Sequence, residues 1–192
     1  MRLVIQYVFS VIFIIQMYLM MVLVTVFFTP IVLFRGDLSM TAINTWCGWV
    51  KFTAKLLVGI KTEVRGIIPD DEVLIISKHQ SFLDIIMIVS ALNQPKFIMK
   101  KEILITPIIG FWAKKIGCIP IDRGKKGAAI KEMVKAVHMS SKKKPGQLII
   151  FPQGTRVAPK AQAPYTIGSG VLYSELNQDC VPVATNVGML WP

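Results

Sequence analysis

An uncharged apolar stretch near the amino terminus limits what this chain can fold into. Every residue from Leu3 to Phe34 is uncharged, most are aliphatic or aromatic, and Arg2 and Arg35 bracket the stretch. A helix needs about 20 apolar residues to cross the hydrocarbon core of a bilayer, and the stretch is too long for the core of a signal peptide. It predicts a membrane anchor, either one tilted helix that ends near Thr29-Pro30 or a helical pair that enters one leaflet.

The segment after this stretch, residues 39–60, combines apolar residues with spaced lysines. It predicts an amphipathic helix at the level of the lipid head groups, and a core helix of the next domain is the alternative. Lys51, Lys55, Lys61 and Arg65 lie in or just after this segment. By the positive-inside rule they keep the following domain in the cytoplasm, so we expect the cytoplasmic side of a bacterial inner membrane.

The charge of the chain is strongly positive, with 22 Lys and Arg against 11 Asp and Glu and a net charge of +11. Nearly all of it follows the apolar stretch, since only Arg2 and Arg35 precede Asp37. A basic domain on an apolar anchor favours membrane lipids with anionic head groups, or phosphate-bearing substrates, as partners. Nucleic acid competes as a partner, but the sequence has no helix-turn-helix, zinc-finger or RNP-like pattern, so we expect none.

Three cysteines, Cys47, Cys118 and Cys180, stand far apart and form no C-x-x-C pair. This spacing argues against a zinc site and against a disulfide framework, and it fits a reducing compartment. We therefore expect small core or lipid-facing cysteines and no metal site.

Short apolar runs alternate with helical patterns through the rest of the chain. Strands are expected at residues 73–77, 96–99, 118–121, 147–151 and 181–184, and helices at 82–92, 102–116 (broken or kinked at Pro107) and 128–140. Such alternation predicts an α/β domain, a largely parallel sheet flanked by helices. We expect two regions: residues 1–60, anchoring and interfacial, and residues 61–192, the α/β domain.

His79 and Asp84 form the first candidate site. Five positions apart on one helix they would diverge by about 140°, so they meet only if His79 precedes the helix and Asp84 lies in its first turn. Ser81 is a natural N-cap there. A carboxylate behind an imidazole fixes its tautomer and makes it a general base. The alternative is that Ser81 and Asp84 form only a capping box, with His79 a loop residue.

Two further motifs follow expected strands. The turn at residues 151–156 (FPQGTR) combines a glycine, a hydroxyl and Arg156, which suits a phosphate through backbone N–H groups and the guanidinium; an ordinary turn is the alternative. Residues 117–123 (GCIPIDR) place Arg123 at another strand end, where a surface Asp122–Arg123 pair is the alternative reading.

Together, four ordered blocks at residues 79–84, 117–123, 151–156 and 181–184 resemble the glycerolipid acyltransferases. Within that family the chain is most similar to the 1-acylglycerol-3-phosphate (lysophosphatidic acid) acyltransferases. The resemblance covers nearly the whole chain and implies transfer of an acyl group to lysophosphatidic acid, with acyl-CoA or acyl-carrier protein as co-substrate and no other cofactor.

The resemblance also implies roles for individual residues. His79 is the base and Asp84 supports its imidazolium. The acceptor phosphate is expected to contact the residues of the second and third blocks and of the KKE stretch, namely Arg156, Gly154, Thr155, Arg123, Lys100 and Lys101. The fourth block is associated with donor binding or packing of the site, and its Pro182 favours packing.

Two features depart from the family pattern. Gln153 stands where the third block usually has an acidic residue, and an amide removes a negative charge while adding hydrogen-bond donors; we expect it to support the site. The chain also ends at Trp191-Pro192, soon after the fourth block, whereas relatives usually continue, so we expect a fragment or a minimal form.

Two other functions are consistent with this sequence. The same chemistry can serve another lysolipid acceptor, because few residues contact the head group. A non-catalytic, membrane-bound lipid-binding protein is the second alternative, suggested by Gln153 and the short carboxyl-terminal part.

Overall fold

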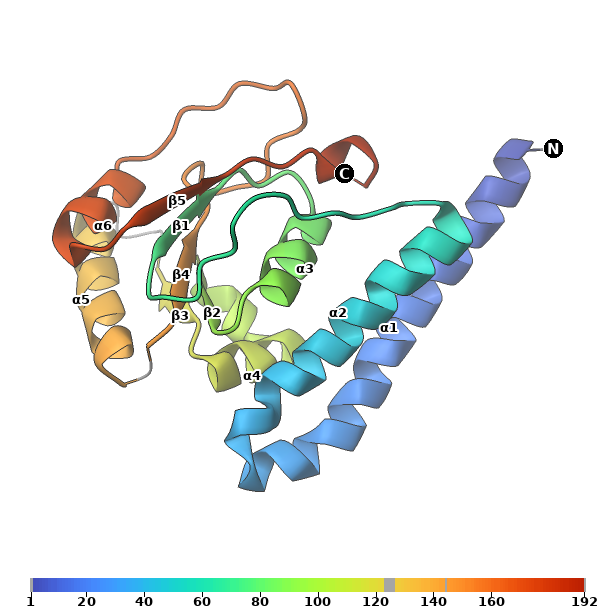
Figure 1. Cartoon of the computed structure of the whole chain (residues 1–192), viewed down its shortest axis with the longest axis horizontal. Coiled ribbons are helices and arrows are strands. Elements are labelled where there is room, and N and C mark those ends of the chain that lie inside the picture. Colours follow the sequence, from blue (N-terminus) through green and yellow to red (C-terminus); the bar gives the residue numbers. More distant parts are fainter. Residues whose placement is uncertain (1, 123–126, 144, 192) are drawn as a thin grey trace.

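The chain folds into a sheet with helices on both sides and a pair of long helices at one side (Figure 1). The computed structural model describes residues 2–122, 127–143 and 145–191. Its helices are α1 (Arg2–Phe34), α2 (Ser39–Val58), α3 (Phe82–Ala91), α4 (Pro107–Ile116), α5 (Gly127–Lys143) and α6 (Gly168–Leu176). Short 3₁₀ turns among the described residues are η1 (Gly36–Leu38), η2 (Lys101–Ile105) and η4 (Val187–Met189).

The sheet is parallel throughout. Its strands are β1 (Leu74–Ser77), β2 (Pro95–Lys100), β3 (Ile119–Ile121), β4 (Gln147–Ile150) and β5 (Cys180–Val183), in the spatial order β3-β2-β4-β1-β5. Every neighbouring pair is parallel. Short runs rich in aliphatic residues suit such strands, because helices cover both faces of a parallel sheet. The predicted α/β fold with a parallel sheet is confirmed.

Alternate residues of the central strands pack on opposite faces of the sheet. Ile75 and Ile149 belong to a buried cluster with α1, α2 and α3. Leu74 and Leu148 belong to a second cluster with α5 and α6. This two-residue alternation is the ordinary geometry of a strand. It gives three layers, with α1 to α4 on one side and α5 and α6 on the other (Figure 1).

Helices α1 and α2 lie side by side at one edge of the molecule (Figure 1). Phe13 and Met17 of α1 pack with Cys47 and Val50 of α2, and Trp46 Nε1 donates to the carbonyl oxygen of Met17 at 3.1 Å. One helix in the described part of the chain, at Leu3–Phe34, is long and apolar enough to cross a membrane. Only 17% of the most apolar 18-residue stretch of this helix is buried against protein.

The structure corrects the expected end of α1 and shows which face of α2 packs on the core. We expected a single span to end near Thr29-Pro30, but α1 continues through Pro30 to Phe34. Helix α2 returns beside it, and one face of α2 packs into the core of the α/β layers through Cys47 and Ala54. On this face α2 is therefore a core helix, as the alternative expected, while Phe52 and Leu56 on the opposite face are exposed. The interfacial position of α2 and the division at residue 60 stay predictions.

The expected strands agree with the observed ones to within one residue at each end. The helix expected at residues 102–116 is divided into η2 and α4, because Pro107 takes the first helical position, where its missing N–H is not needed. Thr106 caps α4 by accepting from Gly110 N at 3.2 Å. Helix α6 was not predicted, since its two glycines and two serines weaken the helical signal.

The close approach of η2 and α4 leaves no room for a side chain at Gly110. A Cβ atom there would overlap the backbone carbonyl oxygen of Leu104, so we expect Gly110→Ala to lower the free energy of unfolding by about 1–3 kcal/mol. Gly48→Ala is the matched control, because Gly48 lies on α2 with nothing near its Cβ position. Thermal unfolding of both variants in detergent micelles measures the difference, and equal stability of the two would contradict this packing.

Candidate active site

The carboxyl ends of all five strands meet at one edge of the sheet. Because the strands are parallel, this edge gathers Lys78-His79 after β1, Lys100 at the end of β2, Asp122 after β3, residues 151–156 after β4 and Thr185 after β5. Ligands of open parallel sheets bind at this edge. The topology therefore brings together blocks that are up to 100 residues apart in the sequence.

His79 and Asp84 meet at the junction of β1 and α3. His79 lies in the loop after β1, and Asp84 is the third residue of α3. His79 Nδ1 is 3.1 Å from Asp84 Oδ2. The His79 imidazole is 15% exposed and the Asp84 carboxylate is fully buried. Solvent can therefore reach part of the imidazole but not the carboxylate. The predicted geometry, with Ser81 as N-cap between them, is confirmed.

Asp84 contacts both the start of helix α3 and the imidazole of His79. It completes a capping box: Leu83 N donates to Ser81 Oγ at 3.1 Å, and Ser81 N donates to Asp84 Oδ2 at 2.8 Å. The backbone N–H of Gln80 donates to the same carboxylate oxygen. One oxygen atom can accept from the cap and from the imidazole because a carboxylate oxygen has more than one lone pair.

Thr185, which follows β5, completes the environment of the carboxylate. Its hydroxyl donates to Asp84 Oδ1 at 2.6 Å. Burial raises the pKa of Asp84, but the hydrogen bonds from His79, Thr185, Ser81 N and Gln80 N outweigh it and hold the pKa below its usual value. Asp84 is therefore ionised at neutral pH, as support of an imidazolium requires. Sequence reasoning missed Thr185; its position directly after the fourth block was the available signal.

Phe151, the first residue of the third block, holds the imidazole from its face. The two rings stack with centroids 4.0 Å apart and an angle of 15° between their planes. Phe97 of β2 stacks behind Phe151 at 5.9 Å. Val157 N also donates to the carbonyl oxygen of His79 at 2.8 Å. The ring orientation is thus set by Asp84 at one edge and by Phe151 across one face.

The third block forms a tight turn. Gly154 N donates to the carbonyl oxygen of Phe151 at 2.9 Å, and Gly154 has φ of +70°, a left-handed conformation that favours glycine. Thr155 and Arg156 follow the turn and are exposed to solvent. The turn thus presents a hydroxyl and a guanidinium at the same edge of the sheet as His79.

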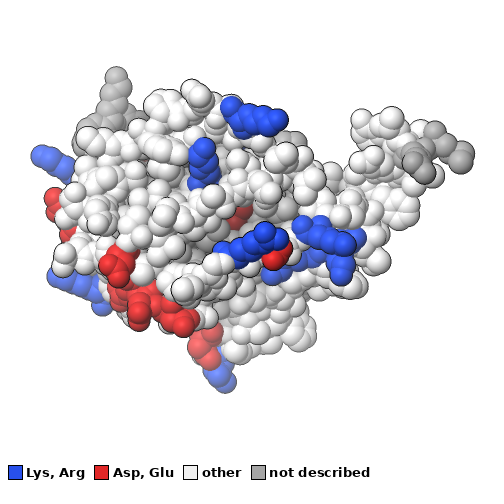
Figure 2. All heavy atoms as spheres, turned by 45° about the horizontal axis from the view of Figure 1, so that its top comes forward, with Lys and Arg blue, Asp and Glu red and all other residues white. Residues whose placement is uncertain are grey.

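The other expected phosphate contacts are only partly brought together. Lys100 is exposed at the end of β2. Lys101 forms an ion pair with Asp122 of the second block. Arg123 lies outside the described residues. On the face shown in Figure 2, basic side chains are spread over the surface, whereas most of the acidic side chains gather toward one border.

The two supporting residues behave differently from each other. Pro182 is exposed on β5, an edge strand that tolerates a residue without an N–H. Val181 and Val183 of the same block pack on the core, and the expected supporting role of Pro182 stays a prediction. Gln153 is half-buried, and its Oε1 is covered without a hydrogen-bond partner within the described part of the chain.

The cysteines offer no nucleophile or metal ligand set. All three are free, and burial raises the pKa of Cys118 to about 11, so this thiol stays protonated at neutral pH. Among the described residues, no three His, Cys, Asp or Glu side chains are grouped closely enough to hold a metal ion.

The sequence model of a family named Acyltransferase matches residues 60–186, a range that contains β1 to β5 together with His79, Asp84 and Thr185. The chain belongs to this acyltransferase family. Its match begins just after α2, so the family pattern corresponds to the layered domain.

Known members of the family resemble the chain over most of its length. It is 30% identical over 168 residues to a 1-acyl-sn-glycerol-3-phosphate acyltransferase of Pseudomonas aeruginosa, covering 86% of this chain and 65% of the relative. A chloroplastic 1-acyl-sn-glycerol-3-phosphate acyltransferase of Brassica napus is 29% identical, covering 69% of this chain and 41% of the relative. The chain thus spans two thirds or less of the length of these relatives.

One solved structure has the same fold. The crystal structure of the 1-acyl-sn-glycerophosphate acyltransferase PlsC from Thermotoga maritima superposes with a TM-score of 0.72, covering 92% of this chain and 74% of that chain. The two sequences are 19% identical, so this likeness concerns the fold.

The low pKa of Asp84 links the site to the stability of the protein. The ordinary pKa of this group is 3.8, so its ionisation stabilises the fold above that pH and the contribution is lost as the pH falls through the lower folded pKa. We expect Asp84→Asn to lose about 1.5–3 kcal/mol of unfolding free energy at pH 7. The difference from the parent protein should shrink below pH 4.

Denaturant unfolding in detergent between pH 3 and pH 7 measures this difference. Thr185→Val should show a smaller loss with the same pH dependence, because it removes one of the donors. Asp71→Asn, at an exposed turn far from the site, is the control. A deficit of Asp84→Asn that stays constant over the whole range would contradict the linkage.

Proposed function

We propose that the chain transfers a fatty acyl group from acyl-CoA or acyl-carrier protein to the free hydroxyl of lysophosphatidic acid, giving phosphatidic acid. The observation that carries the proposal is the His79–Asp84 pair at the carboxyl edge of the sheet. The printed names of the P. aeruginosa and B. napus relatives support the substrate assignment.

The pair suits a one-step transfer. Since Nδ1 of His79 faces Asp84, its Nε2 is available to accept the proton of the acceptor hydroxyl. The hydroxyl oxygen attacks the thioester carbonyl, the new C–O ester bond forms and the C–S bond breaks. The departing sulfur takes the proton from the imidazolium, which restores the base. Asp84 stays ionised throughout and stabilises the imidazolium.

The basic groups near the pair suit a phosphorylated acceptor. Arg156 and Thr155 follow the third-block turn, and Lys100 lies at the end of β2. A guanidinium can bind a phosphate with two parallel hydrogen bonds. We assign the acceptor phosphate to these residues, with Gly154 shaping the turn.

The apolar surface of α1 and α2 suits attachment to a membrane. Helix α1 exposes apolar side chains along most of its length, and α2 adds Phe52 and Leu56. In water such a surface would favour association, whereas in a bilayer it is solvated by lipid. We therefore propose a membrane protein whose α/β domain lies at the cytoplasmic surface, with the acceptor supplied from the lipid phase.

Replacing the base should stop the reaction without unfolding the protein. We expect His79→Ala to lower the rate of CoA release about 10²–10⁴-fold in a thiol assay with lysophosphatidic acid and acyl-CoA. His138→Ala is the matched control, because His138 is the second of the two histidines and is exposed on α5. Activity of His79→Ala equal to that of the control would overturn the assignment of the base.

Replacing the guanidinium should weaken binding of the acceptor more than the chemistry. We expect Arg156→Ala to raise KM for lysophosphatidic acid about tenfold or more, since a charge-assisted pair is lost. The KM for acyl-CoA should change little. Lys135→Ala, on the exposed face of α5, is the control.

A panel of acceptors decides between this function and its alternatives. Preference for a lysolipid without a terminal phosphate would favour another acceptor and remove Arg156 as its ligand. Lipid binding without turnover by the parent protein, with either donor, would favour the non-catalytic alternative.

A further inference from the structure

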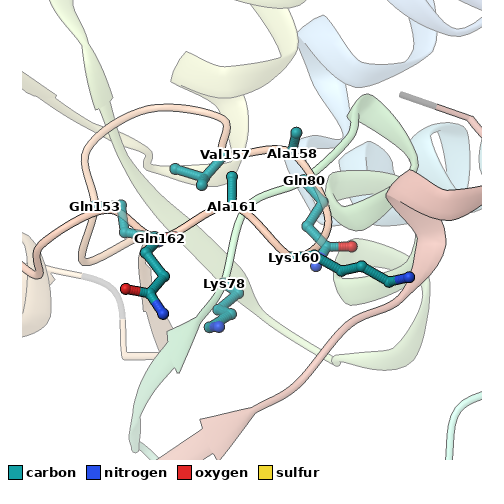
Figure 3. A pocket seen from close by; sticks show the side chains of 8 residues that line it. All are labelled: Lys78, Gln80, Gln153, Val157, Ala158, Lys160, Ala161 and Gln162. Atoms are coloured by element: carbon teal, nitrogen blue, oxygen red, sulfur yellow. The ribbon is translucent and has the colours of Figure 1, made fainter.

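A polar hollow lies beside the His79–Asp84 pair and has no role in the scheme above. It has a volume of about 150 Å³ and is lined by two lysines, three glutamines and three small or branched apolar residues: Lys78, Gln80, Gln153, Val157, Ala158, Lys160, Ala161 and Gln162. Lys78 and Gln80 flank His79 directly in the sequence. Figure 3 shows the segment after the third block passing over Lys78, so that the hollow is formed between this segment and the end of β1.

The charge of the hollow favours an anion. Lys78 and Lys160 both have exposed ammonium-bearing side chains, and no acidic residue contributes to the lining. In the described part of the chain, neither lysine forms an ion pair with a carboxylate. Gln153 adds an amide where the family pattern usually has an acid, so no negative charge opposes an anionic ligand here.

The segment over the hollow is held in one shape. Val157 N donates to His79 O at 2.8 Å, and Thr166 N donates to Pro152 O at 2.8 Å. Between them, Ala161 N donates to Ala158 O at 3.1 Å. Lys160 has φ of +68°, a left-handed conformation that is unfavourable for a residue with a long side chain. Such strain persists where the surrounding structure enforces it, often at ligand sites.

An exposed amide gives the lining a second chemical property. Gln162 lines the hollow and is exposed to solvent, and its amide oxygen can accept a hydrogen bond from an N–H group of a ligand. The lining therefore suits a molecule that carries both a phosphate and an amide N–H.

Strand alternation at the end of β1 places Lys78 and His79 on opposite sides of the sheet. Ile75 packs on the side of α1 to α3 and Ile76 on the side of α5 and α6. Lys78 N continues the strand pairing by donating to Val183 O at 3.4 Å. Alternation along this extended backbone then places Lys78 on the side of α5 and α6. His79 returns to the other side, where Phe151 stacks on it.

We propose that this hollow binds the phosphate end of the pantetheine arm of the acyl donor. The inference rests on the proposed function, which requires a thioester donor. A lipid acceptor reaches His79 from the apolar side formed by α1 and α2, so the hollow on the other side suits a water-soluble molecule. Phosphopantetheine is common to CoA and to carrier proteins. Its amide groups supply an N–H that the exposed amide of Gln162 can accept, and its flexible arm separates the phosphate from the thioester near His79.

Equilibrium binding of CoA to the full chain in detergent micelles tests the proposal, with pantetheine as the ligand that has the same arm but no phosphate. We expect CoA to bind at least tenfold more tightly than pantetheine. The double variant Lys78→Ala/Lys160→Ala should lose this difference, and Lys78→Arg/Lys160→Arg should keep most of it. Lys131→Ala/Lys135→Ala, two exposed lysines on α5, should bind CoA like the parent.

Each outcome either supports or overturns the proposal. Unchanged CoA affinity in the alanine double variant, or an equal loss in the α5 control, would overturn it. A parent protein that prefers CoA no more than pantetheine would also overturn it. If the alanine variant instead raises KM for lysophosphatidic acid and not for the donor, the hollow holds the acceptor phosphate and the proposal is wrong.

Measurements on the parent protein separate the two proposals. Binding does not need turnover, so lysine-dependent CoA binding by a parent protein that transfers no acyl group would reject the proposed function and keep this inference. Acyl transfer by the alanine double variant with an unchanged donor KM would reject the inference and keep the function.

Discussion

The buried carboxylate of Asp84 is the interaction on which the arrangement of the site depends. A buried charge is costly unless several donors surround it, and here the donors come from separate segments. The backbone of residues 80 and 81, the imidazole of His79 and the hydroxyl of Thr185 all point at the same group. Satisfying Asp84 therefore fixes the end of β1, the first turn of α3 and the end of β5 relative to one another.

This arrangement explains how one short motif can both start a helix and orient a histidine side chain. The capping box starts α3, and the same carboxylate orients the imidazole that a base requires. Phe151 adds a constraint from β4, so three neighbouring strands position one ring. A change to any of these contacts would alter the stability of the junction together with the orientation of the base.

The parallel sheet also gives the site two different sides. The apolar helices α1 and α2 cover the side of the imidazole, whereas α5 and α6 cover the other side (Figure 1). On the proposed function, the two substrates differ in the same way, since the acceptor is a lipid and the donor carries a water-soluble phosphate end. Successive side chains of a strand point to opposite faces, so the neighbours Lys78 and His79 lie on different sides of the sheet. The donor and the acceptor can therefore approach the site from different sides.

Much of this protein follows from local patterns in its sequence. The apolar stretch predicts a long exposed helix because lipid-facing side chains need no core, and the short aliphatic runs predict strands because the sheet is buried on both faces. Ser81 and Asp84 predict the start of α3, since capping is a contact between near neighbours. The glycines of α6 weakened the helical pattern of its sequence, and the helix is stabilised by packing through Leu172. Pro30 does not end α1, because an apolar helix can continue past one missing hydrogen bond.

Contacts between distant residues were decided only by the tertiary structure. Thr185 reaches Asp84 across about a hundred positions, Lys101 pairs with Asp122, and Val181 and Val183 pack on the core. No local pattern encodes these contacts, because they depend on the strand order β3-β2-β4-β1-β5. The sequence by itself determined the chemical groups and the elements that carry them. The parallel sheet decided which of those groups meet, because it places every strand end at one edge.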